Sequence, residues 1–329
     1  MLFVDNERIS DPRVNLAIEE HLLRNFQTEE DILLFYVNEP SIIIGRNQNT
    51  LEEINHHYVK EKGIHVVRRL SGGGAVYHDF GNLNFSFITN SGKENFNNFK
   101  KFTAPVIKAL IGLGVEAELG GRNDILVKGR KISGNAQYIT GKRMVSHGTL
   151  LFDSDLSQVV EALNVKMSKI TSKGIKSVRS RVVNICEFLG KPMDLDSFRA
   201  YLIDSIFERS NKITSYTLAA EDWQAVKILV DERYDSWEWN YGRSPDFNIQ
   251  KTRRFLTGEI DARIDVQRGR IINIKFYGDF LGQGNVEDLE DMLKGIRYDR
   301  DHLHGVIQGL DLSYYFGQVV DDEFLDFIY

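Results

Sequence analysis

The chain has 329 residues, 42% of them hydrophobic and 27% charged, which predicts a globular protein with one large domain and a smaller one. Its 47 acidic and 41 basic residues leave a formal net charge of −6, which argues against general nucleic-acid binding. A single cysteine excludes an internal disulfide. No apolar run is long enough to cross a bilayer, and the first residues lack the pattern of a signal peptide. We therefore expect a cytoplasmic protein that binds neither nucleic acid nor membrane.

Apolar residues at helical spacing predict a first helix over residues 12–25. The β-rich runs that follow predict strands over residues 32–37, 41–45, 64–70 and 83–89. A second helix is predicted over residues 102–113, ended by Gly114. Further strands are predicted over residues 115–119, 124–128, 131–139 and 146–152. Because short strands joined by short turns favour antiparallel pairing, we predict an α+β fold with a mixed, largely antiparallel sheet flanked by helices.

The second half of the chain contains two segments of distinct composition. Residues 166–181 carry six basic residues and no acidic one, and their poor periodicity predicts a mobile basic loop. The turn-rich residues 242–246 are typical of a linker. Beyond them we predict a hairpin over residues 258–266 and 270–277, and helices over residues 286–293 and 321–328. The predicted domains are therefore residues 1–243 and residues 250–329, the second a small α+β domain.

The most informative stretch is residues 68–82, in which two arginines precede three consecutive glycines. The glycines leave main-chain N–H groups uncovered, so an anion or a flat ring can approach the backbone. The arginines can complement a phosphate or a carboxylate. The stretch is neither a Walker A loop, because no Gly-Lys-Ser/Thr follows, nor a Rossmann fingerprint, because it enters another strand. A glycine triplet alone is often only a turn, but with these neighbours it indicates a site for an anionic nucleotide or a carboxylate.

Four further clusters have both a structural and a functional interpretation. Lys131 is part of a solvated hairpin tip, or a fixed positive charge for a ligand oxygen. Asn123 and Asp124 are turn residues, or contacts for a base or a magnesium ion. His147 is a lone histidine on a strand, a pattern that is more often structural than catalytic. Cys186 has apolar neighbours, which favour a buried, inert thiol over a nucleophile.

At these residues the sequence resembles the lipoate–protein ligase A family. The matching motifs follow the family's order over most of the first 185 residues, at residues 15–20, 68–82, 121–124, 131–134, 147–150 and 173–184. The tail resembles the family's small C-terminal domain, and the Gly-Arg-Gly-Arg loop of biotin ligases is missing. The resemblance implies the catalytic core shared by biotin ligases and class II aminoacyl-tRNA synthetases, in agreement with the predicted mixed sheet.

The resemblance also implies a two-step reaction that serves lipoate salvage. Lipoate would attack the α-phosphate of ATP, giving lipoyl-AMP and pyrophosphate. A lysine on a lipoyl domain would then take the lipoyl group and release AMP. Magnesium is implied as the counter-ion of ATP. The implied acceptor proteins are the acyltransferase subunits of 2-oxoacid dehydrogenases and the glycine-cleavage carrier protein.

The family's motifs also imply the residues of the site. Lys131 is the implied catalytic residue, contacting the lipoyl carbonyl oxygen and the α-phosphate, where negative charge develops. The implied contacts of ATP and the adenylate are Arg69, Gly74, Ala75, Val76, Tyr77, Asn123, Asp124 and Lys131, with Asp124 also the magnesium ligand. The implied contacts of lipoate are Arg68, Ser71, Gly72, Gly73, Lys131 and His147. Lys173, Arg179 and Arg181 belong to the implied adenylate-binding loop, which we expect to close over the intermediate and exclude water.

Two other functions remain open at this point. Related amidotransferases and octanoyltransferases move a lipoyl or octanoyl group through a cysteine thioester without ATP, and Cys186 is the one cysteine available for this chemistry. A non-catalytic module that senses lipoate or the adenylate would need neither Lys131 nor a complete adenylate-binding loop.

Overall fold

The computed structural model describes residues 1–26, 28–92, 94–163, 181–208, 213–242, 249–267, 269–298 and 300–329. These residues form two compact units that are interleaved along the chain. The first unit comprises residues 1–43, 53–68 and 76–240, and the second comprises residues 44–52, 69–75 and 241–329. Residues 44–52 and 69–75, in the N-terminal half, therefore belong to the same unit as the C-terminal residues. A single boundary near residue 243 does not describe this division of the chain.

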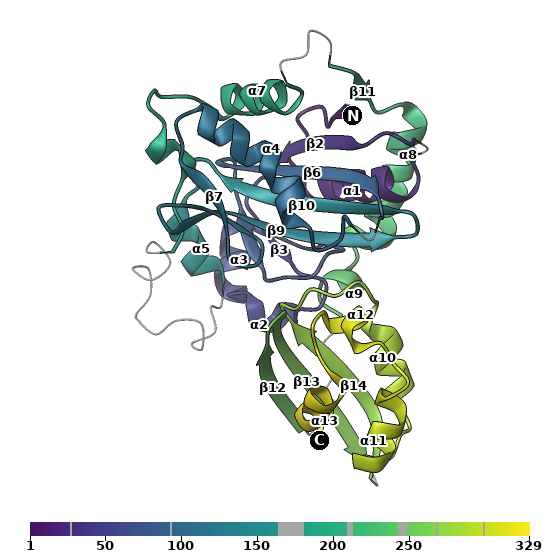
Figure 1. Ribbon diagram of the computed structural model, residues 1–329. Helices are drawn as coiled ribbons and strands as arrows, with labels where there is room; N and C mark the ends of the chain where they lie inside the picture. The colour runs from purple at the N-terminus through teal and green to yellow at the C-terminus, as the bar shows by residue number, and fades with distance from the viewer. Residues whose placement is uncertain are drawn as a thin grey trace. The chain divides into compact units, whose positions relative to one another are not determined.

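The first unit is built on an eight-stranded sheet with the strand order β11–β1–β2–β6–β10–β9–β8–β7 (Figure 1). β1 runs parallel to β11 and β2, whereas the pairs from β2 to β7 are antiparallel. The predicted mixed, largely antiparallel sheet is thus confirmed. The strands are β1 (Leu2–Asp5), β2 (Ile32–Val37), β6 (Asn82–Asn90), β7 (Ala117–Gly120), β8 (Asp124–Val127), β9 (Arg130–Thr140), β10 (Arg143–Leu151) and β11 (Ser215–Thr217). A smaller sheet has the order β4–β3–β5, with β3 (Ser41–Ile44), β4 (His65–Arg68) and β5 (Val76–His78).

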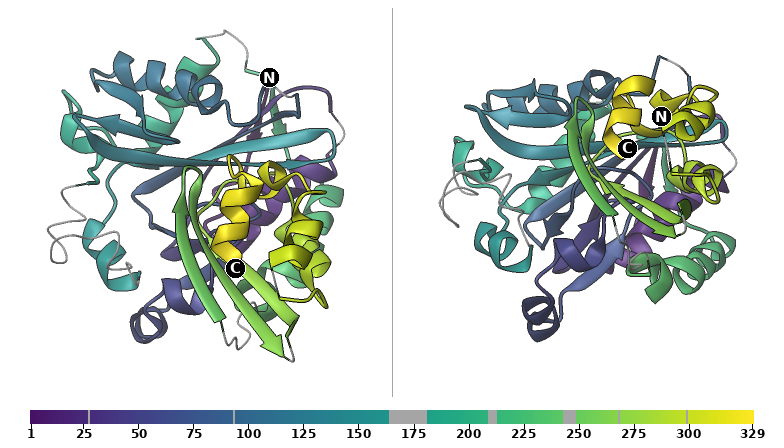
Figure 2. Two further views of the ribbon diagram at one scale, coloured as in Figure 1. Left: turned by 60° about the horizontal axis from the view of Figure 1, so that its bottom comes forward. Right: turned by 90° about the horizontal axis from the view of Figure 1, so that it is seen from below.

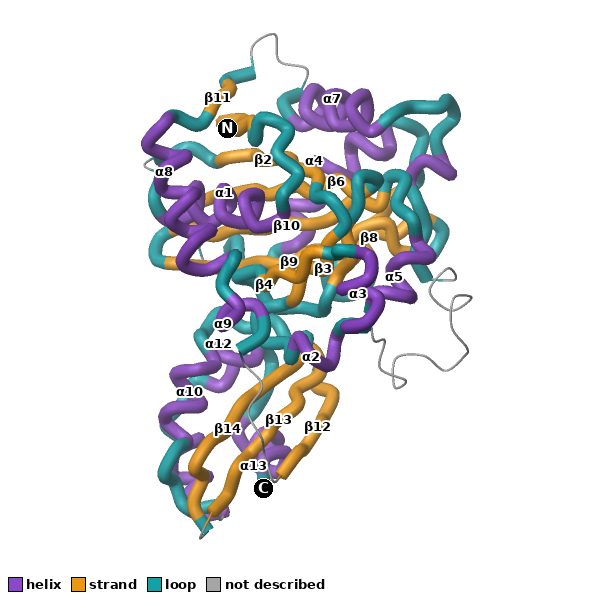
Figure 3. The backbone as a smooth tube through the Cα atoms, turned by 180° about the vertical axis from the view of Figure 1, so that it is seen from behind, coloured by secondary structure: helices purple, strands orange, loops and turns teal. Residues whose placement is uncertain are grey.

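Helices cover both faces of the large sheet. α4 (Phe99–Gly112) and α7 (Leu195–Ile206) lie against one face, as Figure 1 shows, and bury aromatic side chains such as Phe85, Phe102 and Phe198 beneath them. α1 (Pro12–Arg24) and α8 (Ala220–Leu229) lie against the other face (Figure 3). The other helical segments before residue 241 are α2 (Thr50–Glu53), α3 (His56–Lys62), α5 (Leu156–Ala162), the 3₁₀ turn η2 (Ile185–Phe188), the π-helical turn η3 (Val230–Tyr234) and α9 (Trp237–Asn240). No helix in the described part of the chain has the length and apolar character needed to cross a membrane.

The second unit contains the three-stranded antiparallel sheet β12 (Ile249–Phe255), β13 (Gly258–Gln267) and β14 (Arg270–Gly278). Its helices α10 (Val286–Leu293), α11 (Arg300–Ile307), α12 (Leu312–Phe316) and α13 (Asp321–Ile328) gather on one face of this sheet (Figure 2). Ile264, Phe276, Phe316 and Phe324 belong to the core that these elements enclose. The predicted hairpin and the two predicted helices of this segment are confirmed.

Polar side chains of α1 are buried and tie the helix into the first unit. The helix begins at Pro12. The Asp11 side chain caps its first turn by accepting a hydrogen bond from the N–H of Arg13. Asn15 is fully buried, accepts from Asn6 Nδ2 and donates to Asn38 Oδ1, each at 2.9 Å. Buried polar groups are costly unless they are paired, so these bonds fix where the helix lies on the sheet. Asn15 of the motif at residues 15–20 therefore has a structural role.

Candidate functional site

Lys131 lies at the start of β9, just after a tight hairpin turn. Lys128 and Gly129 form this turn with φ angles of 51° and 74°, and two positive φ values in succession are typical of a type I′ turn. The register between β8 and β9 then shifts by one residue, so that Lys131 is opposite Leu126 and Ser133 is opposite Ile125. A bulge of this kind re-aims the side chains beside it. The sequence predicts a tight hairpin turn over residues 128–131 with Gly129 first, whereas in the structure Lys128 and Gly129 are its two central residues, and the bulge was not predicted.

The ammonium group of Lys131 forms an ion pair with Asp124. Lys131 Nζ lies 2.8 Å from Asp124 Oδ1, and about a third of each side chain is exposed, 36% and 33% respectively. A Cβ atom on Gly134 would lie 2.7 Å from the same Nζ, so the missing side chain leaves the space that the ammonium group occupies. The structure thus brings the predicted residues Lys131 and Asp124 together above a glycine.

Both backbone hydrogen-bonding groups of Lys131 are satisfied by one neighbouring segment, residues 181–183. Its N–H donates to the carbonyl oxygen of Arg181 at 2.7 Å, and its own carbonyl oxygen accepts from the N–H of Val183 at 3.0 Å. Lys131 therefore lies between β8 and residues 181–183, where the predicted adenylate-binding loop ends. Of that loop, Arg181 is described and exposed, whereas Lys173 and Arg179 lie outside the described residues.

Asn123 is bound closely to β9. Its side-chain amide donates to the carbonyl oxygen of Asn135. Its own carbonyl oxygen accepts from the backbone N–H of Asn135 at 3.0 Å and from the side chain of Asn135 at 2.9 Å. These bonds hold the start of β8, and with it Asp124, against β9. A contact between Asn123 and ATP stays a prediction.

The predicted glycine loop belongs to the second unit, where Arg69 organises it. Arg69 Nε donates to Ser71 Oγ at 3.0 Å, and its terminal nitrogen donates to the carbonyl oxygens of Gly72 at 2.7 Å and Gly74 at 2.9 Å. A Cβ atom on Gly72 would lie 2.6 Å from the carbonyl oxygen of Phe280, a backbone atom that cannot swing aside. Gly72 is therefore required by close packing within the second unit.

The neighbouring glycines differ from Gly72. Gly73 has a φ of 92°, a backbone conformation that favours glycine, whereas a Cβ atom on Gly74 would meet nothing within 4 Å. Ala75 follows, and Val76 enters β5 opposite Ile43. The roles of these residues in binding lipoate or the adenylate stay predictions.

Arg68 and Tyr77 are both buried in the first unit. Arg68 is 1% exposed, its Nε donates to the carbonyl oxygen of Trp239 at 2.9 Å, and its carbonyl oxygen accepts from Trp239 Nε1 at 2.8 Å. These bonds join β4 to α9 and give Arg68 a structural role beside its predicted contact with lipoate. Burial, together with the charge of Asp79, raises the pKa of Tyr77 to about 12, so its phenol stays protonated at neutral pH.

Cys186 lies in the 3₁₀ turn η2, with its thiol 3.4 Å from Asp153 Oδ1. Burial, followed by the hydrogen bond to Asp153 and its charge, raises the pKa of the Cys186 thiol to about 11. The nucleophile in thioester formation is the thiolate, so this environment is unsuited to that chemistry.

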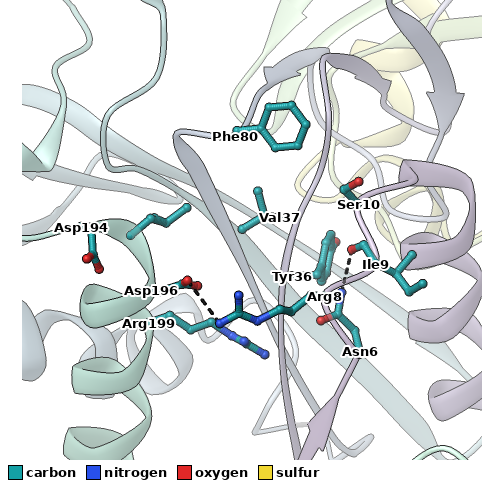
Figure 4. Close-up of a pocket in the computed structure, with 11 residues that line it drawn as sticks. Asn6, Arg8, Ile9, Ser10, Tyr36, Val37, Phe80, Asp194, Asp196 and Arg199 are labelled. Carbon is teal, nitrogen blue, oxygen red and sulfur yellow. Dashed lines mark hydrogen bonds and ion pairs between the residues drawn. The ribbon is translucent and has the colours of Figure 1, made fainter.

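One pocket of the first unit, with a volume of about 540 Å³, lies away from these residues (Figure 4). Its walls include the exposed side chain of Phe80 and the ion pair between Arg8 and Asp196, at 3.2 Å. Lys131, Asp124 and His147 are not among its lining residues. It is therefore separate from the candidate site.

Comparison with known proteins identifies the family. Residues 11–207 match the model of the lipoyl protein ligase A/B catalytic domain, and residues 244–328 match that of the bacterial lipoate protein ligase C-terminus. The chain belongs to the lipoate–protein ligase family. It is 56% identical to the lipoate-protein ligase LplJ of Bacillus subtilis over the whole of both chains. It is 50% identical to lipoate–protein ligase 1 of Staphylococcus aureus over 97% of each chain. The predicted family and enzyme class are thus confirmed.

Several solved structures resemble this chain in three dimensions. The lipoate complex of P. falciparum LipL1 has a TM-score of 0.77 at 27% identity, over 99% of this chain and 97% of that one. The bi-partite ligase of Thermoplasma acidophilum, analysed with its E2 lipoyl domain, has a TM-score of 0.66 at 31% identity over 75% and 98% of the two chains. A lipoate-protein ligase A bound with ATP has a TM-score of 0.62 at 30% identity over 74% and 97%. These likenesses confirm the predicted fold class.

Proposed function

We propose that this chain activates lipoate with ATP and transfers the lipoyl group to a lysine of a lipoyl-domain protein. The observation that carries the proposal is the arrangement of Lys131, Asp124 and Gly134, found in a chain of the lipoate–protein ligase family. The Lys131 ammonium group pairs with the Asp124 carboxylate and fills the space over Gly134, on a strand whose backbone bonds to residues 181–183. Ligases of known structure that resemble this chain bind lipoate or ATP, which supports the same substrates here.

The charge of Lys131 explains how the first step would proceed. Lipoate carboxylate and ATP triphosphate are both anionic, so their approach needs a cation where they meet. With the Lys131 ammonium group there, a carboxylate oxygen forms a bond to the α-phosphorus and the bond to pyrophosphate breaks. In the second step the acceptor amine bonds to the lipoyl carbonyl carbon, the bond to AMP breaks and the amine loses a proton. The same ammonium group stabilises the negative charge on the carbonyl oxygen.

Asp124 suits a magnesium ion that arrives with the nucleotide. Among the described residues, no three His, Cys, Asp or Glu side chains are grouped to hold a metal ion. Magnesium in nucleotide sites keeps several waters and binds through one or two carboxylates and the substrate phosphates, so a single carboxylate fits. Asp124 would hold the ion, which would neutralise the triphosphate and aid departure of pyrophosphate.

The proposed acceptors are lipoyl-domain proteins. The structural relative from T. acidophilum was analysed together with an E2 lipoyl domain, which supports this class of partner. We extend the proposal to the acyltransferase subunits of 2-oxoacid dehydrogenases and the glycine-cleavage carrier protein, with the reaction in the cytoplasm.

Mass spectrometry of the protein mixed with lipoic acid and MgATP, without acceptor, tests the proposed function directly. We expect lipoyl-AMP bound to the protein and one equivalent of pyrophosphate released. If neither forms, but the protein still moves a lipoyl group from a donor protein, the ATP-dependent mechanism is wrong. If neither reaction occurs, the chain is a binding module.

Cys186→Ser is expected to leave both half-reactions within about twofold of the unchanged protein, because the thiol is neutral and bonded to Asp153. Rates of lipoyl-AMP formation and of transfer to a lipoyl domain measure this. A loss of transfer with adenylation intact would instead support the thioester route.

A further inference from the structure

The pocket drawn in Figure 4 lies at the carboxyl ends of two parallel strands, and the proposed mechanism does not use it. Its walls include the loop after β1, the end of β2 and the start of α7, and β1 and β2 are adjacent and parallel. Ligand sites commonly lie in the crevice outside the carboxyl ends of parallel strands. The volume of about 540 Å³ falls in the range of pockets that take small molecules. All of the lining residues belong to the first unit.

Arg199 on α7 is a largely buried cation whose hydrogen-bonding groups are incompletely used. Its side chain is 17% exposed, and one terminal nitrogen lies 3.4 Å from Asp5 Oδ1. The guanidinium group also lies over the ring of Phe3, 5.9 Å from the ring centroid. Its Nε is buried and has no hydrogen-bond partner among the residues that the structure describes. A buried donor without an acceptor is unfavourable, so the Arg199 guanidinium group is suited to an acceptor that enters the pocket.

The loop after β1 brings a second guanidinium group to the same pocket. Asn6 Nδ2 fixes this loop by donating to the carbonyl oxygen of Ile9 and to Asn15 Oδ1, both at 2.9 Å. Arg8 has a positive φ of 59°, an unfavourable conformation for a residue with a side chain and one that is enriched at ligand sites. Its ion pair with Asp196, at 3.2 Å, joins side chains that are 75% and 67% exposed. Because exposed ion pairs contribute little, a ligand anion can replace Asp196 at small cost.

The pocket combines these charges with an apolar side. Four apolar side chains also line it, those of Ile9, Val37, Phe80 and Leu195. Phe80 is 60% exposed, which is unusual for a large aromatic residue and leaves its ring available to a ligand. Figure 4 shows Phe80 and Val37 on the opposite side of the pocket from Arg8 and Arg199. A ligand that fits both sides has an anionic end and an apolar body.

The charges of the lining residues favour a ligand with a single negative charge. The two arginines are balanced by two aspartates, Asp194 and Asp196. Asp194 is occupied in capping α7, where it accepts a hydrogen bond from the N–H of Ser197 at 2.7 Å. A carboxylate adds one negative charge and can accept two parallel N–H bonds from an arginine. A phosphate would add up to two charges to a pocket that is already balanced, so a carboxylate fits better.

We propose that this pocket is a second ligand site, which binds a small monocarboxylate with an apolar body. The carboxylate accepts hydrogen bonds from Arg199 and Arg8, and the hydrocarbon part packs against Phe80, Val37 and Leu195. The ligand is bound without any bond being made or broken. The site shares no lining residue with the candidate site at Lys131, so the inference does not depend on the proposed function.

The experiment titrates phenylacetate into the whole chain, labelled at its methyl groups, and follows the NMR signals of Ile9, Val37 and Leu195. We expect all three signals to shift. Phenylacetamide has the same shape without the charge, and we expect it to bind at least about 10-fold more weakly, the effect of losing a charged hydrogen bond. Arg199→Gln should weaken phenylacetate binding by a similar factor. Arg143→Gln is the matched control, because Arg143 also has a buried Nε without a partner among the described residues but does not line the pocket.

The comparison of the acid with the amide is made on the unchanged protein, so the test does not depend on any variant folding. If phenylacetate leaves the three methyl signals unmoved, or if phenylacetamide binds equally well, the proposed site is wrong. Tighter binding of phenyl phosphate than of phenylacetate would show that the pocket takes a dianion, and would contradict the assigned ligand class. Equal weakening by Arg199→Gln and Arg143→Gln would contradict the role of Arg199.

Discussion

Lys131→Ala is expected to lower the rate of lipoyl-AMP formation by about 10³, the upper range for removing one group that stabilises developing negative charge. The variant should still fold, because the Lys131 side chain is a third exposed and its backbone bonds to Arg181 and Val183 are kept. Pyrophosphate release with saturating lipoate and MgATP measures the effect. Lys131→Arg is expected to recover only part of the rate, because a planar, delocalised guanidinium group does not present the compact point charge of an ammonium group.

Lys128→Asn is the matched control for this prediction. Lys128 is an exposed cation in the same hairpin, and asparagine tolerates its positive φ of 51°. Adenylation should remain within about threefold of the unchanged rate. Equal losses in the two variants would mean that the general positive charge of the hairpin matters, and would contradict a specific role for Lys131.

Gly72→Ala is expected to destabilise the second unit by about 1–3 kcal/mol, the usual cost of forcing extra atoms into a packed site. The added methyl group would lie 2.6 Å from the carbonyl oxygen of Phe280, and backbone must move to relieve the contact. Urea unfolding followed by hydrogen exchange at amides of β13 and β14 would measure the loss.

Gly74→Ala is the control in the same loop, because a Cβ atom there meets nothing within 4 Å. Its stability should change by no more than about 0.5 kcal/mol, as for most unconstrained surface positions. If Gly72→Ala is as stable as Gly74→Ala and loses only lipoate affinity, the glycine at position 72 leaves space for the ligand and the packing argument is wrong.

Two of the helices that were predicted correctly, α1 and α10, have starts that are marked by capping residues nearby in the sequence. Pro12 after Asp11 marks the start of α1, and the predicted helix over residues 286–293 has the bounds of α10, where the Asn285 side chain caps the first turn. α4 begins at Phe99, three residues before the predicted start, because Asn98 caps it and accepts from the N–H of Lys101. α7 was not predicted, although Asp194 caps it and Phe198, Leu202 and Ile206 have helical spacing. That signal was present in the sequence.

The site was predictable only where its residues are close in the chain. Lys131 and Asp124 are seven residues apart in one hairpin, and motif matching found both. His147 Nδ1 lies 2.9 Å from the carboxylate of Glu19, which is 128 residues away on α1, and nothing local to either residue indicates their pairing. Likewise, the requirement for glycine at position 72 arises from Phe280, which only the folded chain brings near. Such long-range relations depend on strand order, which composition and periodicity do not specify.

The interleaving of the two units limits how this chain can be divided. A protein ending near residue 243 would keep the loop at residues 69–75 but lose Phe280, against which Gly72 packs. Residues 241–329 expressed alone would lack both N-terminal segments of their own unit. A chimera that exchanges only the C-terminal region between two ligases would join a glycine loop to strands it did not evolve with. A workable exchange must carry residues 44–52 and 69–75 along with the C-terminal region. If the protein is divided into two polypeptides, the second one must supply Phe280, against which the loop at residues 69–75 packs.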